Sequence, residues 1–225
     1  MERKHAVKPR LSSLALLLPV LLLFARVAGA QSYYYNPGPL HWYVMGGLNQ
    51  PVGNTSQLLQ SGWDVGGGLE VRQGGNPLSL RLEVSYATNN AAHGLIDQGE
   101  QQTGLQITGG WADLWTGTAN AEFRVPFGRG IEGYVIGGVG AYYTRLSLTQ
   151  YGYGYVCDPW WNYCYFASGD LLVARHDVTK FGWNAGAGVS VDLRNGMALF
   201  IEARYNAIQM SQTFQYVPIN IGLRF

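Results

Sequence analysis

The sequence is poor in charge and in motifs that carry chemistry. Charged residues make up 13% of its 225 residues, about half the ~25% typical of soluble domains, and the formal net charge is +1. So small a net charge gives no reason to expect a polyelectrolyte partner. The sequence contains no phosphate-binding loop, no zinc-ligand spacing and no basic aromatic array. We therefore expect no cofactor, no bound metal and no nucleic-acid partner.

Long apolar runs are absent after the first thirty residues, so no later segment predicts a transmembrane helix. The leader itself has basic residues, an apolar core over 14–24 and the small residues Ala28, Gly29 and Ala30. This pattern predicts a signal peptide over residues 1–30, cleaved after Ala30. A transmembrane anchor would need about 20 apolar residues, more than this run supplies. The mature chain, 31–225, is then an exported soluble β domain or an outer-membrane barrel.

Glycine and aromatic residues are abundant instead. The chain has 31 glycines, and 13% of its residues are aromatic. Glycine is at about twice its usual ~7%, while the mean hydropathy is close to zero, at -0.04. This composition suits strands with one lipid-facing and one polar face, because the two faces cancel in the average.

Apolar and polar residues alternate along eight segments, which is the two-residue period of a half-apolar strand. The clearest is the last, where one parity is wholly apolar: Val217, Ile219, Ile221, Leu223 and Phe225. The seven earlier segments are 42–48, 63–72, 78–86, 115–125, 132–146, 181–193 and 199–206. Both parities of 132–146 look apolar, so its inward face is not assigned.

The connections between these segments alternate in length. Polar stretches at about 49–62, 87–112 and 147–178, with a shorter one at about 210–215, alternate with tight turns. A soluble sandwich gives no reason for this alternation, whereas a membrane barrel has long outer loops and short periplasmic turns. Aromatic residues near strand ends also favour a barrel with interfacial belts: Trp63, Tyr86, Trp115, Tyr134, Tyr142, Phe181 and Trp183. The predicted fold class is all-β, a transmembrane eight-stranded antiparallel up-and-down β-barrel.

Four segments carry a resemblance to a known family: GGVGAYY at 137–143, FGWNAGAGVSVDL at 181–193, LFIEARY at 199–205 and INIGLRF at 219–225. With the leader and the strand order, the mature chain resembles the small outer-membrane barrels of the OmpA-like and opacity-protein type. The resemblance implies an outer membrane of a Gram-negative cell. It also implies periplasmic chaperones and the barrel assembly machinery as partners, with Phe225 as part of the assembly signal. It implies little about activity, since such barrels include adhesins, structural proteins and a few lipid-modifying enzymes.

Charged residues recur as i, i+2 pairs on the polar parity of the strands. They are Glu70 and Arg72, Arg81 and Glu83, Glu122 and Arg124, Glu202 and Arg204, with Arg224 as a fifth guanidinium. Their charges nearly cancel, and the interior of an eight-stranded barrel is just wide enough to be filled by side chains. Arginine–carboxylate pairing would bury them without an unpaired charge. We therefore favour a salt-bridge plug over a gated ion path.

The two cysteines, Cys157 and Cys164, lie in the longest predicted loop, 147–178. In an oxidising compartment a local disulfide is favoured over a metal site, which would need more ligands than two thiols. The same loop is rich in aromatic residues: Tyr151, Tyr153, Tyr155, Trp160, Trp161, Tyr163, Tyr165 and Phe166. These residues form either a self-packed cap over the barrel mouth or a recognition surface for a host surface, a glycan or another protein.

Catalytic groups are not expected. His93 with Asp97 and His176 with Asp177 fall in predicted outer loops, and His41 falls at the opposite end. No strand position would hold a serine beside either loop histidine, as a hydrolase needs. The sequence therefore predicts a monomeric barrel in outer-membrane lipid, with an envelope-structural or surface-adhesion role. A lipid-modifying barrel enzyme and a narrow solute pore remain as alternatives.

Overall fold

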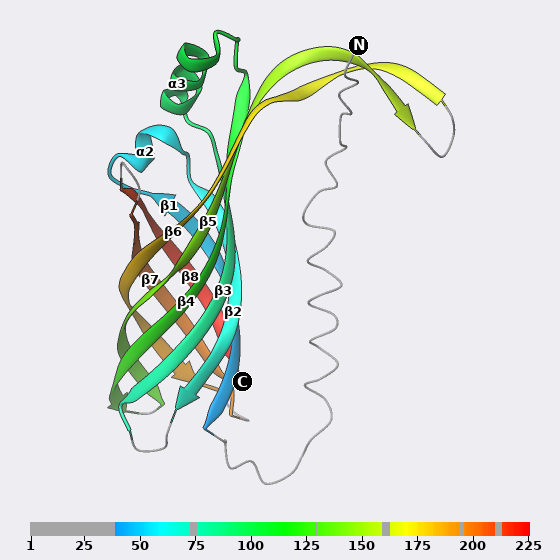
Figure 1. Cartoon of the computed structure of the whole chain (residues 1–225). Helices are drawn as coiled ribbons and strands as arrows, with labels where there is room; N and C mark the ends of the chain where they lie inside the picture. Colours follow the sequence, from blue (N-terminus) through cyan, green and yellow to red (C-terminus); the bar gives the residue numbers. More distant parts are fainter. Residues whose placement is uncertain (1–38, 73–75, 129, 159–162, 194–195, 210–212) are drawn as a thin grey trace. The chain divides into compact units, whose positions relative to one another are not determined.

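Eight antiparallel strands close into one barrel in the computed structural model of the chain (Figure 1). The structure describes residues 39–72, 76–128, 130–158, 163–193, 196–209 and 213–225, so the predicted leader lies outside the described residues. The strands are β1 Leu40–Pro51, β2 Gly62–Arg72, β3 Leu78–Asn90, β4 Gly109–Gly128, β5 Ile131–Asp158, β6 Tyr163–Asp192, β7 Ala198–Ile208 and β8 Phe214–Arg224. Neighbours in sequence pair with each other, and β1 also pairs with β8. The predicted up-and-down barrel is confirmed.

The barrel wall is apolar outside and polar inside. Leu82, Val139 and Ile221 are 62%, 65% and 56% exposed on the outer face. Inside, Glu70 is 0% exposed and Arg81 is 1% exposed. A wall of this polarity is unfavourable in water and favourable in a bilayer, because the exposed apolar side chains then face lipid.

The structure assigns the faces of β5, which the sequence left open. Tyr134 and Tyr142 are 4% and 0% exposed in the interior, whereas Val135 and Val139 face outward. The prediction that Tyr134 and Tyr142 belong to an interfacial belt is therefore wrong. In β5 the even-numbered residues face inward, because Tyr134 pairs with the inward Arg124 of β4.

Two of the predicted loops contain helices. The stretch 49–62 includes α2, Thr55–Leu58, and the stretch 87–112 includes α3, His93–Thr103. They contribute to an apolar cluster at this end of the barrel: Leu59, Ala91, Leu95, Ile107, Ala112 and Leu148. The loops thus pack together instead of forming independent polar connections. Within the described residues, no helix has both the length and the hydropathy that crossing a bilayer requires.

The prediction of a loop over 147–178 is wrong, because most of that range is β-structure. β5 continues to Asp158, and β6 begins at Tyr163. The two strands form a long hairpin, and its residues 151–171 are grouped apart from the barrel residues 37–150 and 172–225. The two strands satisfy each other's backbone hydrogen bonds, so they can remain paired in water. Alternate residues of this extension therefore need not be apolar, as they must be where one face contacts lipid.

The β4–β5 connection at the other end of the barrel is tight, as predicted. β4 ends at Gly128 and β5 begins at Ile131. Gly128 and Gly130 have φ angles of 94° and 75°, which side-chain-bearing residues rarely adopt. These glycines allow β4 to reverse into β5 within a few residues.

Candidate functional site in the lumen and on the hairpin

The nine charged residues singled out in the sequence all face the barrel interior. Eight of them are buried, and the side chain of Arg72 is 31% exposed at the rim. They come from β2, β3, β4, β7 and β8, so the network joins strands that are distant in sequence. Buried charges of this kind require partners, because an unpaired ion in a low-dielectric interior is strongly destabilising.

Arg124 is the centre of the half of the network that lies nearer the short turns. Its guanidinium contacts Glu70 at 2.9 Å and Glu132 at 3.0 Å, and it also pairs with Glu122. Arg224 binds the same Glu70 at 2.8 Å. One guanidinium thus bridges three carboxylates, and each carboxylate is fixed from more than one side.

Glu132 belongs to this network, although the pattern of its strand did not reveal it. It accepts hydrogen bonds from Arg72 at 2.6 Å and from Arg124 at 3.0 Å. With Glu132 included, the arginines and glutamates of the network are equal in number: Arg72, Arg81, Arg124, Arg204 and Arg224 against Glu70, Glu83, Glu122, Glu132 and Glu202. The carboxylate that the predicted set lacked is supplied by β5.

Arg81 is the centre of the other half. It donates to Glu202 at 2.7 Å and to Glu83 at 3.2 Å, and it reaches Glu122 at 3.4 Å. Its guanidinium also lies over the ring of Tyr43, 4.2 Å from the centroid, in cation–π geometry. Because Glu122 also binds Arg124, both halves form one continuous network.

Amide groups fill the lumen on the loop side of the charges. Asn220 donates to Asp64 at 2.9 Å, and Asn184 donates to Asn120 at 2.8 Å. A cavity of about 10 Å³ remains beside Asp64 and Asn220, at the lower limit for one water molecule. The described interior is therefore packed with side chains, as the narrow radius of an eight-stranded barrel requires.

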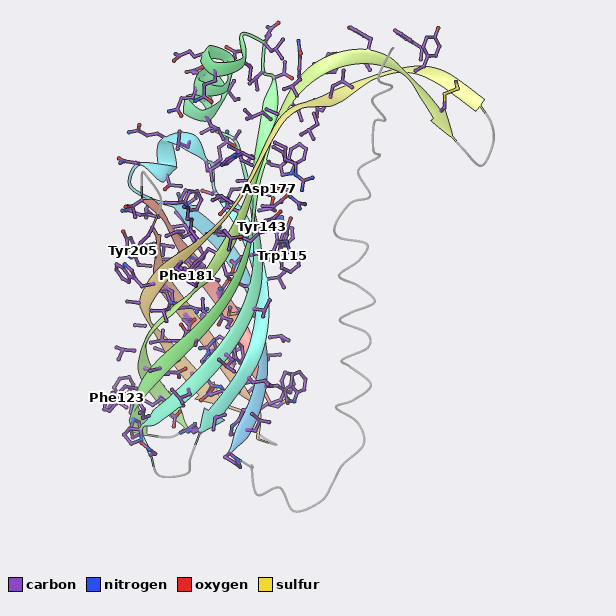
Figure 2. The ribbon with its side chains drawn as sticks, viewed as in Figure 1. Trp115, Phe123, Tyr143, Asp177, Phe181 and Tyr205 are labelled. Carbon is purple, nitrogen blue, oxygen red and sulfur yellow. A yellow bond between two sulfur atoms is a disulfide. The ribbon has the colours of Figure 1, made fainter. Side chains whose placement is uncertain are left out.

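Aromatic side chains form a belt across the outer wall near the loop end, from β2 to β7. Figure 2 shows Trp115, Tyr143, Phe181 and Tyr205 at similar heights on the barrel, with Phe123 near the short turns. Ring contacts connect neighbouring strands, with Tyr86 5.0 Å from Trp115 between centroids. Such belts mark the interface between hydrocarbon and water.

The hairpin unit, 151–171, carries the predicted disulfide. Cys157 and Cys164 are bonded, with their Cα atoms 4.0 Å apart across the two strands. Of the predicted recognition residues, Tyr153 and Tyr155 are 69% and 74% exposed. Trp160 and Trp161 lie outside the described residues. Tyr163 and Tyr165 are described by their backbone position in β6 alone.

The described aromatic residues of the hairpin form one connected surface, which we call the aromatic face: Tyr151, Tyr153, Tyr155 and Phe166. Neighbouring ring centroids are 5.4–6.0 Å apart. The rings contact each other and remain at least half exposed. They are therefore not packed away as a cap within this unit.

The structure places the two histidine–aspartate pairs suggested by the sequence in α3, for His93 and Asp97, and in β6, for His176 and Asp177. His93 opens α3, and Asp177 pairs with Arg175 at 2.9 Å and with Arg145 at 3.3 Å. Among the described residues, no cluster of three or more His, Cys, Asp or Glu side chains is placed to hold a metal ion.

The barrel, its lipid-facing wall and its filled interior define the class: a small transmembrane β-barrel of the outer-membrane type. Solved structures share this fold. The chain is similar to neisserial surface protein A from Neisseria, with a TM-score of 0.52, 14% identity and coverage of 83% of this chain and 96% of that one. It is equally similar to a major outer membrane protein from Thermus thermophilus, with a TM-score of 0.52, 14% identity and coverage of 83% and 98%. At this identity the likeness shows the fold alone. No protein-family model matches the sequence, and no curated protein does.

Proposed function

We propose that the protein is a surface-interaction protein of an outer membrane, in which the barrel is a rigid anchor and the β5–β6 hairpin binds a partner. The observation that carries this proposal is the aromatic face, where Tyr151, Tyr153, Tyr155 and Phe166 are 50–74% exposed. Exposed aromatic surface of this extent is costly in water and is typical of contact sites. The outer-membrane location is supported by the fold and by the predicted signal peptide.

The composition of the hairpin unit resembles that of binding surfaces. Tyrosine and glycine are the commonest residues of 151–171, and tyrosine gives a large contact area at a small entropic cost. The same range contains Asp158 and Asp170 but no lysine or arginine. Sulfated or phosphate-rich partners are therefore disfavoured, and neutral or basic surfaces are favoured.

The proposal is tested with the oxidised protein in lipid nanodiscs, applied to an array of neutral and sulfated glycans and to a panel of purified extracellular-matrix proteins. We expect saturable binding to at least one neutral or basic probe. Replacing Tyr153, Tyr155 and Phe166 together by serine should abolish that binding. Leu105→Ser is the matched control, because Leu105 is 44% exposed but lies outside the hairpin. Equal binding by the wild type and the triple variant would contradict the proposal.

A further inference from the structure

A hollow of about 830 Å³ lies on the outer wall of the barrel. Its floor is made by small residues of β4 and β5, where Gly117 pairs with Ala141. Larger apolar side chains, among them Leu82 and Trp183, line its sides. A Cβ atom built on Gly117 would meet nothing within 4 Å, so the hollow is open at that position. Because this wall faces lipid, the hollow is suited to acyl chains.

The outward residues of β4 and β5 change in character from this floor toward the loops. After the pair Gly117 and Ala141 comes the pair Trp115 and Tyr143. The next outward residue of β5 is Arg145, about 13 Å beyond Ala141 at the usual rise per residue. Apolar, aromatic and charged residues thus follow in the order of a bilayer leaflet: chains, interface and headgroups.

Two arginines and one carboxylate meet at the headgroup level. Arg145 and Arg175 both bind Asp177, at 3.3 and 2.9 Å, and their side chains are 37% and 44% exposed. This cluster carries one net positive charge, and exposed ion pairs are weak enough to admit a further anion. Arg145 also donates to the hydroxyl of Tyr143 at 3.0 Å, which holds it near the top of the hollow.

A second carboxylate, Asp113, lies beside this cluster and reduces its net charge without forming an ion pair with Arg145. Asp113 faces Arg145 in the β4–β5 register, but its two oxygens accept hydrogen bonds from Tyr86 at 2.7 Å and from Trp111 at 3.1 Å. The two guanidinium groups therefore share Asp177 as their carboxylate partner. Guanidinium groups bind phosphate oxygens in bidentate geometry, which suits a phosphorylated headgroup.

We propose that this part of the wall binds one anionic phospholipid, with its acyl chains in the hollow over Gly117 and its phosphate at Arg145 and Arg175. The occupant follows from three observations: the apolar floor, the lipid-facing position and the two exposed guanidinium groups at the headgroup level. This site is independent of the hairpin and of any partner that the aromatic face binds.

The chain-binding half is tested by filling the hollow. The full protein is placed in nanodiscs containing equal amounts of phosphatidylglycerol and phosphatidylcholine, and retained lipid is measured by native mass spectrometry. We expect the wild type to retain one phosphatidylglycerol, and Gly117→Leu to lower this retention about tenfold by displacing buried methylene groups. Gly137→Leu is the matched control, since its Cβ would make only an ordinary 3.5 Å contact and Gly137 does not line the hollow.

The headgroup half is tested by the double variant Arg145→Gln with Arg175→Gln. Phosphatidylglycerol retention should fall about fivefold for each arginine, while phosphatidylcholine retention should not change. Equal retention of both lipids by the wild type, an equal loss in Gly137→Leu, or a protein dimer in place of retained lipid would overturn the proposal. Heat-modifiable migration on gels verifies that every variant has folded.

Discussion

At the scale of single residues, the lumen shows how this barrel accommodates the ten charged side chains of the arginine–glutamate network. Each glutamate of the network contacts at least one arginine, and Glu122 contacts both Arg81 and Arg124. Glu122 is 0% exposed, so water cannot replace a lost partner. The network is therefore sensitive to the removal of one member and tolerant only of paired changes.

Glu122→Ala should lower the stability of the barrel by about 3 kcal/mol, near the lower end of the range for breaking a buried ion pair. The loss stays at the lower end because Arg124 keeps Glu70 and Glu132 as partners. Urea unfolding in micelles, followed by the heat-modifiable gel shift, measures the change. Asp97→Ala removes the same charge from an exposed site and should leave the midpoint unchanged. An unchanged midpoint for Glu122→Ala would show that the network does not stabilise the barrel.

The sequence identified nine of these charged residues because strand alternation places them on the polar parity. Glu132 was missed because β5 mixes Gly, Tyr and Val on both parities, so its faces could not be assigned. A usable signal was nevertheless present. A carboxylate within a lipid-spanning strand should face the interior, and Glu132 would have assigned Tyr134 and Tyr142 to the lumen as well. The pairing of Glu132 with Arg72 and Arg124 depends on register and could not be read from one strand.

At the scale of elements, the hairpin differs most from expectation. The range 147–178 was predicted as a loop because apolar and polar residues alternate only in a strand whose two faces lie in different environments. Beyond the membrane both faces of a hairpin meet water, so this signal is lost. The alternation of tyrosine and glycine over 151–155 nevertheless has the two-residue period of a strand, and this repeat could have predicted β-structure here.

The helix α3 was missed for a related reason. Among its eleven residues only Leu95 and Gly99 are buried, too few to give a helical period. The sequence does carry a signal for the end of this helix. Gly104 has a φ angle of 67° and forms a left-handed cap, a position that glycine commonly occupies.

Removing the disulfide should affect the hairpin and spare the barrel. In the double variant Cys157→Ser with Cys164→Ser, the closed loop is lost, and chain-entropy arguments give a local destabilisation of about 2–3 kcal/mol. Chymotrypsin, which cleaves after aromatic residues, should then cut the hairpin roughly tenfold faster or more. The unfolding midpoint of the barrel should not change, because residues 151–171 are grouped apart from the barrel residues 37–150 and 172–225.

The wild-type protein treated with a reductant is the control for that experiment, and it should be cleaved as fast as the double variant. A shift in the barrel midpoint would contradict the independence of the two units. Equal cleavage of oxidised and reduced protein would show that the disulfide does not hold the hairpin together.

At the scale of the whole molecule, the described interior is filled at three successive levels. Ion pairs occupy the half near the short turns, and amides with the small cavity beside Asp64 lie above them. The apolar cluster around Leu95 and Leu148 then packs at the loop end. A solute crossing the barrel would have to displace all three.

In planar lipid bilayers the wild-type protein should therefore show no steady conductance. Glu122→Ala should behave in the same way, because the remaining carboxylates and arginines still fill the lumen. Single-channel recording after insertion of heat-modifiable, folded protein makes the measurement. A stable, continuous current from either protein would contradict the plug and favour a pore.

The aromatic face has a consequence for how relatives of this chain could differ in length. Successive strand residues point to opposite sides, so inserting one residue near Gly152 would turn the tyrosines beyond it to the other side. Inserting two would preserve Tyr153, Tyr155 and Phe166 on a common side. Natural variation that retains this surface should thus lengthen or shorten each arm of the hairpin in even steps, and a single-residue deletion should be as damaging as losing the tyrosines themselves.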